Sequence, residues 1–288
     1  MRNVLAVISL VALSGCSAGF AAPAQQPAAE CLKMSPGRVA PVGVHKGMDQ
    51  RLTRICYQAY AVAFSGVSGT PIWAAELLTR NSVRAARKLP RKDAFFQDGN
   101  VPVADRSSLA SYEGSGLDRG HLAPSGDMPT MAAQRESFSL ANMIPQEPDM
   151  NRYLWSEVES VVRDLAARYD AVHVVTGPMF EEEELATLDG RVLVPTSVFK
   201  AVYIPGRGAA AYVAPNLPQA RVRVVPVARL RERAGLDVFP GLPAKFRNTA
   251  IALPVVTARK RGSHARRIAT LSRRAVDLRG TLADRERP

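Results

Sequence analysis

The sequence is poor in the residues that form the most common metal and nucleophile sites. Its 288 residues include only three cysteines and four histidines. His121 has no second histidine or cysteine near it in the sequence, which argues against a zinc site of the usual kind. The chain also lacks a serine in a nucleophile elbow and a glycine-rich loop with a lysine that would cradle a phosphate. Acyl transfer and P-loop nucleotide chemistry are therefore not expected.

Aromatic residues, acidic residues and long apolar runs are also scarce. Aromatic side chains make up 6% of the chain, and no zinc-finger, helix-turn-helix or stacking pattern is present to read bases. The apolar stretch VLAVISLVAL near the N-terminus is too short to span a bilayer. The formal net charge is +12, and a surface this basic usually meets nucleic acid, an acidic polysaccharide or anionic lipid. An apolar content of 47% is ample for a core.

The first residues are typical of an export signal. The basic start MRN and the apolar run are followed by LSGC, which resembles the lipobox of bacterial lipoproteins. Residues 1–15 would then be a lipoprotein-type signal peptide, Cys16 the lipidation site, and Ser17 a residue that favours the outer membrane. The alternative is ordinary secretion with cleavage near residues 19–22. Either interpretation predicts an exported protein, in the outer membrane, in the periplasm or secreted.

Export affects what we expect of the two remaining cysteines. In an oxidising compartment we expect Cys31 and Cys56 to pair, which would stabilise the fold by roughly 3 kcal/mol on the chain-entropy model. The alternative is two buried thiols.

The composition divides the chain into segments. Residues 16–50 read as a tether and irregular arm, residues 51–254 as the folded domain, and residues 255–288 as a basic tail, expected to be flexible. The tail would bind phosphates or anionic lipid, or have no binding role.

Apolar periodicity predicts several strands and two helices. Alternation over residues 57–63 indicates a strand, with TPIWAAELLTR as its partner, and YDAVHVVTGPMF, VPTSVFKAVYIP and AAAYVAPN indicate others. A helix is expected over residues 149–169, with Asp149 as its N-cap and Trp155 as a core anchor. A shorter helix, VPVARLRERAG, would end at Gly235. Runs of strands with packed helices favour an α+β fold with a mainly antiparallel sheet.

One bent, polar segment, GSGLDRGHLAPSGDM, is the best candidate for chemistry. His45 lies in the arm and His264 in the tail, and His173 falls in a predicted strand, where a hydrogen-bonded core histidine is the default. Only His121 sits in a polar turn beside an acid and an arginine, where it could transfer protons near neutral pH. Downstream, oxygen ligands suited to a hard cation come from Asn142, Gln146, Asn151 and Glu159.

Together these residues make the chain recognisable. It resembles the DNA/RNA non-specific endonucleases, whose active site is a ββα-metal motif, over about residues 52–250. The resemblance rests on DRGH at 118–121 with LAP after it, on ANMIPQ at 141–146, and on Asn151, Trp155 and Glu159 at the family's spacing. The conjunction of motifs is highly specific, and it implies a nuclease domain over residues 51–254.

The resemblance implies a role for each polar residue. His121 would be the general base that activates water, and Asn151 the single direct protein ligand of a mostly hydrated Mg²⁺, with Mn²⁺ as a substitute. Arg119 would hold the phosphate, and Asp118 would fix the local geometry. The products would carry 5′-phosphates, and both DNA and RNA would be substrates because the reaction needs no 2′-hydroxyl.

Other assignments keep two interpretations each. In a regular α-helix Glu159 lies about 12 Å along the axis and about 80° around it from Asn151. It would therefore act through water, or pair with Arg163 four residues on, either within the site or as an exposed salt bridge. Substrate contacts are also expected from Arg91 or Arg87, which otherwise lie in a solvated loop. Asn142 and Gln146 would either contact substrate or bond to the backbone.

Three functions fit these patterns. The first is an exported, metal-dependent endonuclease without sugar or sequence preference. The second is an exported protein of the same fold that only binds nucleic acid, although both His121 and Asn151 are present. The third is a phosphodiesterase that acts on another polyanion or a small nucleotide.

Overall fold

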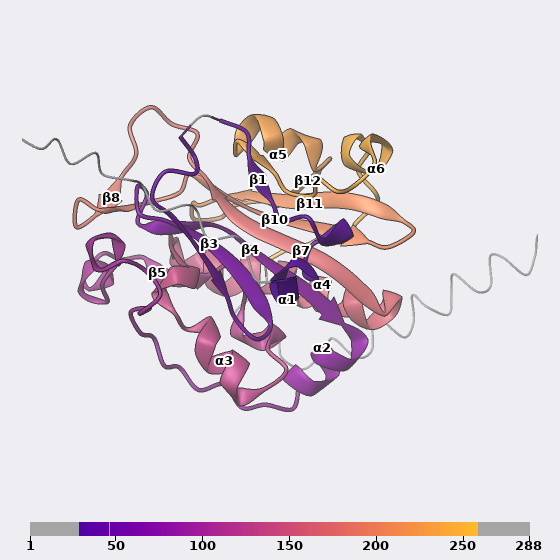
Figure 1. Ribbon diagram of the computed structural model, residues 1–288, viewed down its shortest axis with the longest axis horizontal. Coiled ribbons are helices and arrows are strands. Elements are labelled where there is room, and N and C mark those ends of the chain that lie inside the picture. Colours follow the sequence, from indigo (N-terminus) through magenta and orange to yellow (C-terminus); the bar gives the residue numbers. More distant parts are fainter. Residues whose placement is uncertain (1–28, 46, 259–288) are drawn as a thin grey trace, which may run out of the picture.

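A seven-stranded sheet runs through the centre of the molecule (Figure 1). The computed structural model describes residues 29–45 and 47–258. The strand order is β12-β11-β10-β7-β4-β3-β2, and every neighbouring pair is antiparallel. The strands are β2 (Leu52–Cys56), β3 (Tyr60–Ser65), β4 (Thr70–Thr79), β7 (Ala171–Met179), β10 (Ser197–Ile204), β11 (Gly208–Pro215) and β12 (Arg223–Val225). This architecture confirms the predicted α+β class.

Alternating side chains give the sheet two buried faces, each covered by its own helices. One face packs against α2 (Arg80–Ala86), α3 (Met131–Ser137) and α4 (Ser156–Tyr169). The other packs against α1 (Ala29–Leu32), α5 (Ala228–Arg233) and α6 (Ala244–Asn248). Figure 1 shows α2 and α3 on the opposite side of the sheet from α5 and α6. Successive residues of a strand point to opposite faces, which is why two cores arise from the same strands.

Short elements complete the chain. Pairs of short strands are formed by β1 (Val42–Gly43) with β13 (Leu236–Asp237), β5 (Asp118–His121) with β6 (Met143–Gln146), and β8 (Thr187–Leu188) with β9 (Val192–Leu193). Single tight turns of helix are η1 (Pro36–Arg38), η2 (Val103–Asp105), η3 (Ala110–Tyr112), η4 (Ser125–Asp127) and η5 (Leu140–Asn142). A π-helical turn, η6 (Met150–Trp155), leads directly into α4. The β5–β6 pair and the η6–α4 helix form the ββα unit.

Two local predictions were wrong. The strand expected over residues 57–63 is interrupted, because residues 57–59 form the turn of the β2–β3 hairpin. Asp149 does not cap the long helix, since its backbone is already helical and its side chain makes no capping hydrogen bond. Instead the carboxylate of Glu147 accepts a hydrogen bond from the backbone N–H of Met150 at 2.6 Å.

Other local predictions are confirmed. Trp155 is fully buried in the core under the long helix. The shorter helix ends at Arg233 and is followed by Gly235 at a φ of 63°, the left-handed backbone that favours glycine after a helix. His173 lies in β7, and its Nδ1 makes a 2.8 Å hydrogen bond with the carbonyl of Met34.

The predicted disulfide is present, and it ties the N-terminal arm to the sheet. Cys31 and Cys56 are bonded, with their Cα atoms 5.8 Å apart. Cys31 follows the start of α1, so the bond fastens this segment to the end of β2, an edge strand. The signal peptide, Cys16 and residues 259–288 of the tail lie outside the described residues. Within the described part of the chain, no helix is long and apolar enough to cross a membrane.

Candidate active site

A cavity of about 800 Å³ opens where the ββα unit meets the segment after α2. Its wall includes most of the polar residues that the sequence singled out, together with two aromatic rings. The lining includes Arg91, Asp93, Phe95, Tyr112, Asp118, Arg119, His121, Ser125, Asn151, Arg152, Glu159 and Arg163. Residues separated by more than seventy positions therefore share one wall.

The β5–β6 hairpin brings the DRGH motif to this wall. In its register Asp118 lies opposite Gln146, Gly120 opposite Ile144, and His121 opposite Met143. A Cβ atom on Gly120 would lie 1.9 Å from Oε1 and 2.7 Å from Cβ of Gln146. The motif thus needs glycine because the Gln146 side chain lies directly against the backbone at this position.

His121 sits in an apolar corner of the cavity. Its ring meets the Phe138 ring edge to face, with centroids 5.0 Å apart, and lies 5.8 Å from the Phe95 ring. The buried Nε2 atom has no hydrogen-bond partner among the described residues. Burial, aided by the positive charge of Arg91, lowers the pKa of His121 from 6.5 to about 3. The imidazole is therefore neutral near pH 7 and able to accept a proton.

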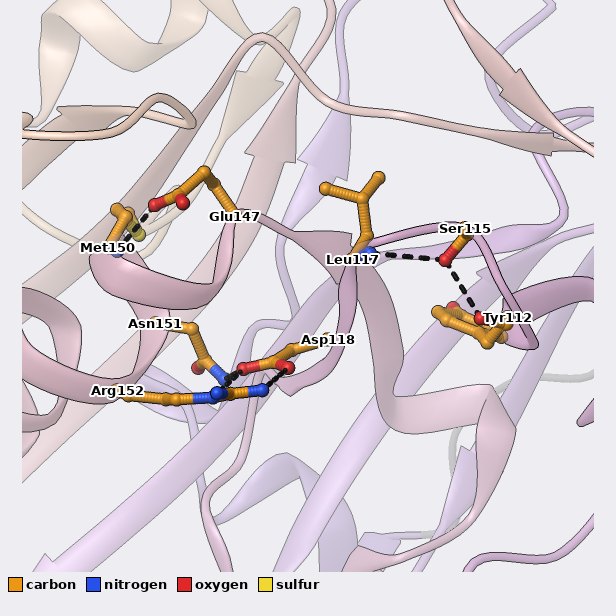
Figure 2. A network of polar contacts seen from close by, with 8 residues as sticks. All are labelled: Tyr112, Ser115, Leu117, Asp118, Glu147, Met150, Asn151 and Arg152. Carbon is orange, nitrogen blue, oxygen red and sulfur yellow. Dashed lines mark hydrogen bonds and ion pairs between the residues drawn. The ribbon is translucent and has the colours of Figure 1, made fainter.

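Asn151, in the π-helical turn, is held by Asp118 of the DRGH motif in β5. Its amide Nδ2 donates to Oδ2 of Asp118 at 2.9 Å, and Arg152 donates to both oxygens of the same carboxylate (Figure 2). Figure 2 also shows Glu147 bonded to the backbone of Met150, one residue before Asn151. Because the amide nitrogen is occupied, the carbonyl oxygen of Asn151 is left to bind a ligand. Asp118 thus fixes the orientation of the amide.

The π-helical turn changes the relation between Asn151 and Glu159. The backbone N–H of Ser156 donates to the carbonyl of Asn151, five residues earlier rather than four. A π turn contains more residues than an α turn, so each residue advances less than 100° and the expected offset of about 80° shrinks. Both side chains consequently line the same cavity. The offset expected for a regular α-helix therefore does not apply to this segment.

Glu159 is half-buried and close to several charges. Burial raises its pKa to about 7, against the lowering effects of Lys200 and Arg163. One interpretation expected an ion pair between Arg163 and Glu159, and this pair does not form. Arg163 pairs instead with the buried carboxylate of Asp127, at 2.7 Å. Asp127 was missed in the sequence because its partner lies on a different element.

The two arginines approach the cavity across aromatic rings. The guanidinium of Arg119 lies 4.4 Å from the centroid of the Phe95 ring. Arg91 lies 5.3 Å from the Phe138 centroid and bonds to Asp93 at 2.6 Å and to Ser125 at 3.2 Å. Such stacking orients a guanidinium while leaving its N–H groups toward the cavity. Sequence reasoning gave no sign of these rings, because Phe95 and Phe138 reach the site from outside the motifs.

Three other predicted residues lie away from the cavity. Arg87 pairs with Asp164 at 2.6 Å and is absent from the cavity wall. Asn142 is fully buried, and its amide bonds to the backbone of Ala123 and Ser137. Gln146 is also fully buried, with its Nε2 3.0 Å from the sulfur of Met150. Of the two interpretations, Asn142 therefore fits bonding to the backbone, and Gln146 contacts a buried side chain instead.

The residues present fit a hydrated divalent cation. Among the described residues no group of three or more His, Cys, Asp or Glu could hold a metal. A metal in this cavity would therefore be bound by few protein atoms and by water, which suits Mg²⁺ because it dehydrates reluctantly. The carbonyl oxygen of Asn151 would be its protein ligand, and the carboxyl group of Glu159 lines the same cavity.

Comparison with known proteins identifies the family of this chain. The family model described as DNA/RNA non-specific endonuclease matches residues 36–245. The chain belongs to this family. The match supports a nuclease, an enzyme that hydrolyses phosphodiester bonds, in a family that depends on a divalent metal.

Individual relatives are consistent with this family. Nuclease C1 of Cunninghamella echinulata is 35% identical over 56% of this chain and 69% of its own. The mitochondrial Nuclease 1 of Schizosaccharomyces pombe is 31% identical over 68% of this chain and 67% of its own. The crystal structure of the EndoG/EndoGI complex contains a chain that aligns with a TM-score of 0.62 and 29% identity. The alignment covers 69% of this chain and 89% of that one.

Gly120→Ala should disrupt the site through Gln146. The new methyl group forces the hairpin or Gln146 to move, so we expect a lower melting temperature and at least a tenfold lower nuclease rate. Gly99→Ala is the matched control, because a Cβ there meets nothing within 4 Å. Restoration of activity by the double change Gly120→Ala/Gln146→Gly, which removes the Cβ of residue 146 as well as its amide, would support the clash, whereas an unaffected single variant would contradict it.

The lowered pKa of His121 predicts an NMR titration. In protein labelled with ¹⁵N-histidine, the His121 signals should titrate well below pH 6.5, and Arg91→Gln should move the midpoint upward by removing a positive charge. The unfolded chain binds this proton near pH 6.5 and the folded chain only at much lower pH. Acidification through that window therefore lowers the free energy of unfolding. A His121 midpoint at or above 6.5 would contradict this assignment.

Proposed function

We propose that the chain is an exported, metal-dependent endonuclease that hydrolyses DNA and RNA without strong sequence preference. The observation that carries the proposal is the convergence of His121 and Asn151 on one cavity, with Asp118 orienting the Asn151 amide. Family membership supports the nuclease activity itself. The residue roles, the choice of Mg²⁺ and the export of the protein are proposals that go beyond family membership.

In the proposed reaction, neutral His121 takes a proton from a water molecule as the water attacks phosphorus. The bond to the 3′-oxygen breaks on the opposite side of the phosphorus, which leaves a 5′-phosphate on the product. Arg119 and Arg91 hold the phosphate, since both guanidinium groups line the cavity and rest on aromatic rings. A phosphate diester bears a negative charge that such groups bind well.

The cofactor that we propose is one Mg²⁺ ion, for which Mn²⁺ can substitute. The Asn151 carbonyl would be its direct protein ligand, and Glu159 would contact it through water. When bound, the ion stabilises negative charge on the reacting phosphate and the departing oxygen. The same positive charge would favour the ionised form of Glu159, whose pKa burial otherwise raises to about 7.

Recognition in this proposal depends on phosphates rather than bases. The cavity wall offers Arg91, Arg119, Arg152 and Arg163, and the whole chain carries a formal charge of +12. Contacts of this kind carry little sequence information and weaken steeply with salt. Water is the nucleophile, so the sugar of the substrate need not supply a 2′-hydroxyl.

We further propose export with a lipid anchor on Cys16, on the basis of the lipobox-like LSGC sequence. Growth of a bacterial host with labelled palmitate should label the wild-type protein, and Cys16→Ser should abolish the label. An unlabelled wild-type protein that is nevertheless found outside the cytoplasm would favour ordinary secretion instead.

A plasmid-nicking assay tests the catalytic proposal. Mg²⁺ should support nicking, EDTA should abolish it, and His121→Ala should lower kcat by about 10²–10⁴-fold because the general base is lost. Asn151→Ala should require much more Mg²⁺ for its residual activity. Arg87→Ala is a suitable control, since this exposed arginine pairs with Asp164 away from the cavity.

Two results would count against these assignments. Full activity in His121→Ala would remove His121 as the base, and an unchanged Mg²⁺ requirement in Asn151→Ala would remove Asn151 from the metal. Products carrying a 3′-phosphate would exclude the proposed direction of bond cleavage.

A further inference from the structure

A lysine is buried in the middle of the sheet, directly behind the β5–β6 strand pair that carries the DRGH motif. Lys200 lies in β10 and is 0% exposed. In the sheet register it pairs with Thr176 of the central strand β7, which pairs in turn with Ala74 of β4. Alternation places Lys200 on the face that carries Val198 and Val202, which is the face covered by the ββα unit.

The ammonium group bridges the sheet and the chain just after His121. Its Nζ donates to Oγ1 of Thr176 at 2.6 Å and to the carbonyl oxygen of Leu122 at 3.3 Å. Leu122 is the residue that follows His121, the last residue of β5. The contact therefore joins the centre of the sheet to the backbone that carries the histidine.

The same short segment is held from the other side by Asn142. The backbone N–H of Leu122 donates to the Asn142 carbonyl at 3.0 Å, and the Asn142 amide bonds to both backbone polar groups of Ala123. Asn142 thus fixes residues 122–123 from the β6 side, whereas Lys200 fixes Leu122 from the sheet. Two independent anchors meet at the peptide groups next to the proposed base.

Stability alone does not account for a lysine at this position. A buried ammonium group loses its hydration, and an apolar side chain of similar size would avoid that cost. Among the described residues no carboxylate oxygen lies within salt-bridge distance of Lys200. Glu76 lies on the same face, but both of its buried oxygens lack hydrogen-bond partners in the described chain. Neutral oxygens of Thr176 and Leu122 are what Lys200 binds.

We infer that Lys200 is a positioning residue that sets the orientation of the His121 ring by holding the Leu122 carbonyl against the central strand. His121 contacts no hydrogen-bonding side chain of the described residues through Nε2, and its ring is located by Phe95, Phe138 and its own backbone. The position of the ring therefore depends on where its own backbone is held. This inference rests on the proposed role of His121 as the base.

The test compares Lys200→Met with a control on the same strand and face. Lys200→Met removes both hydrogen bonds and keeps a long, unbranched side chain. We expect kcat for plasmid nicking to fall by about 10–100-fold, with KM changed less than threefold, because a small misplacement of a catalytic group has effects of this size. Val202→Ala also creates a buried defect in β10, yet it leaves the Leu122 contact intact, so its kcat should stay within threefold.

Two further variants test the other end of the contact and the neighbouring buried acid. Thr176→Val removes the anchor on β7 and should give a smaller loss than Lys200→Met. Burial raises the pKa of Glu76 well above its usual range, so the neutral Glu76→Gln is a mild change that should leave kcat within threefold. A loss in Glu76→Gln as large as that in Lys200→Met would overturn the inference, since a general disturbance of this buried polar cluster and not the Leu122 contact would then account for the loss.

A spectroscopic readout tests the positioning without any metal or substrate. In metal-free protein labelled with ¹⁵N-histidine, Lys200→Met should shift the His121 signals and leave those of His173, on the other face of the sheet, unchanged. Unmoved His121 signals, or an equal shift in Val202→Ala, would overturn the inference. If the wild-type protein cleaves nothing with any divalent ion, the proposed function fails, while the NMR comparison still decides whether Lys200 positions His121.

Discussion

The hydrogen bond from the Asn151 amide to Asp118 is the contact on which the rest of the site depends. It joins the β5 strand to the η6–α4 helix, two elements that reach the cavity by separate routes along the chain. It also fixes the orientation of the amide, because the carboxylate accepts only from the nitrogen. Arg152 completes the arrangement by binding the same carboxylate through its guanidinium. Orientation of a metal ligand by a neighbouring group is a general feature of metal sites.

The fold positions the proposed metal ligand and the proposed base separately. The π-helical turn at Met150–Trp155 rotates Asn151 toward the cavity wall that Glu159 also lines. Lys200 and Asn142 fix the chain immediately after His121. Buried polar groups cost free energy of folding. The buried polar groups behind this cavity therefore indicate that the precise position of the cavity residues is maintained at a cost in stability.

Much of the site could be predicted from the sequence, and what was missed has a common cause. The DRGH motif and the distance to Asn151 were visible because both lie in short, continuous segments. Asp127, Phe95 and Lys200 were not visible, since each acts on a partner from another element. The helix cap failed for a related reason: Asp149 is a good cap by residue type, but the helix begins before it and Glu147 supplies the carboxylate.

By itself the sequence determined the family, the antiparallel α+β class, the pairing of Cys31 with Cys56, and the histidine and amide that we assign to catalysis. These follow from local residue patterns or from motifs that survive as contiguous strings. The tertiary structure alone decided that Asn142 and Gln146 are structural, that Arg91 and not Arg87 lines the cavity, and that Arg163 pairs with Asp127. Those outcomes depend on which side chains contact each other across different strands and helices, and the spacing of residues along the chain does not predict such contacts.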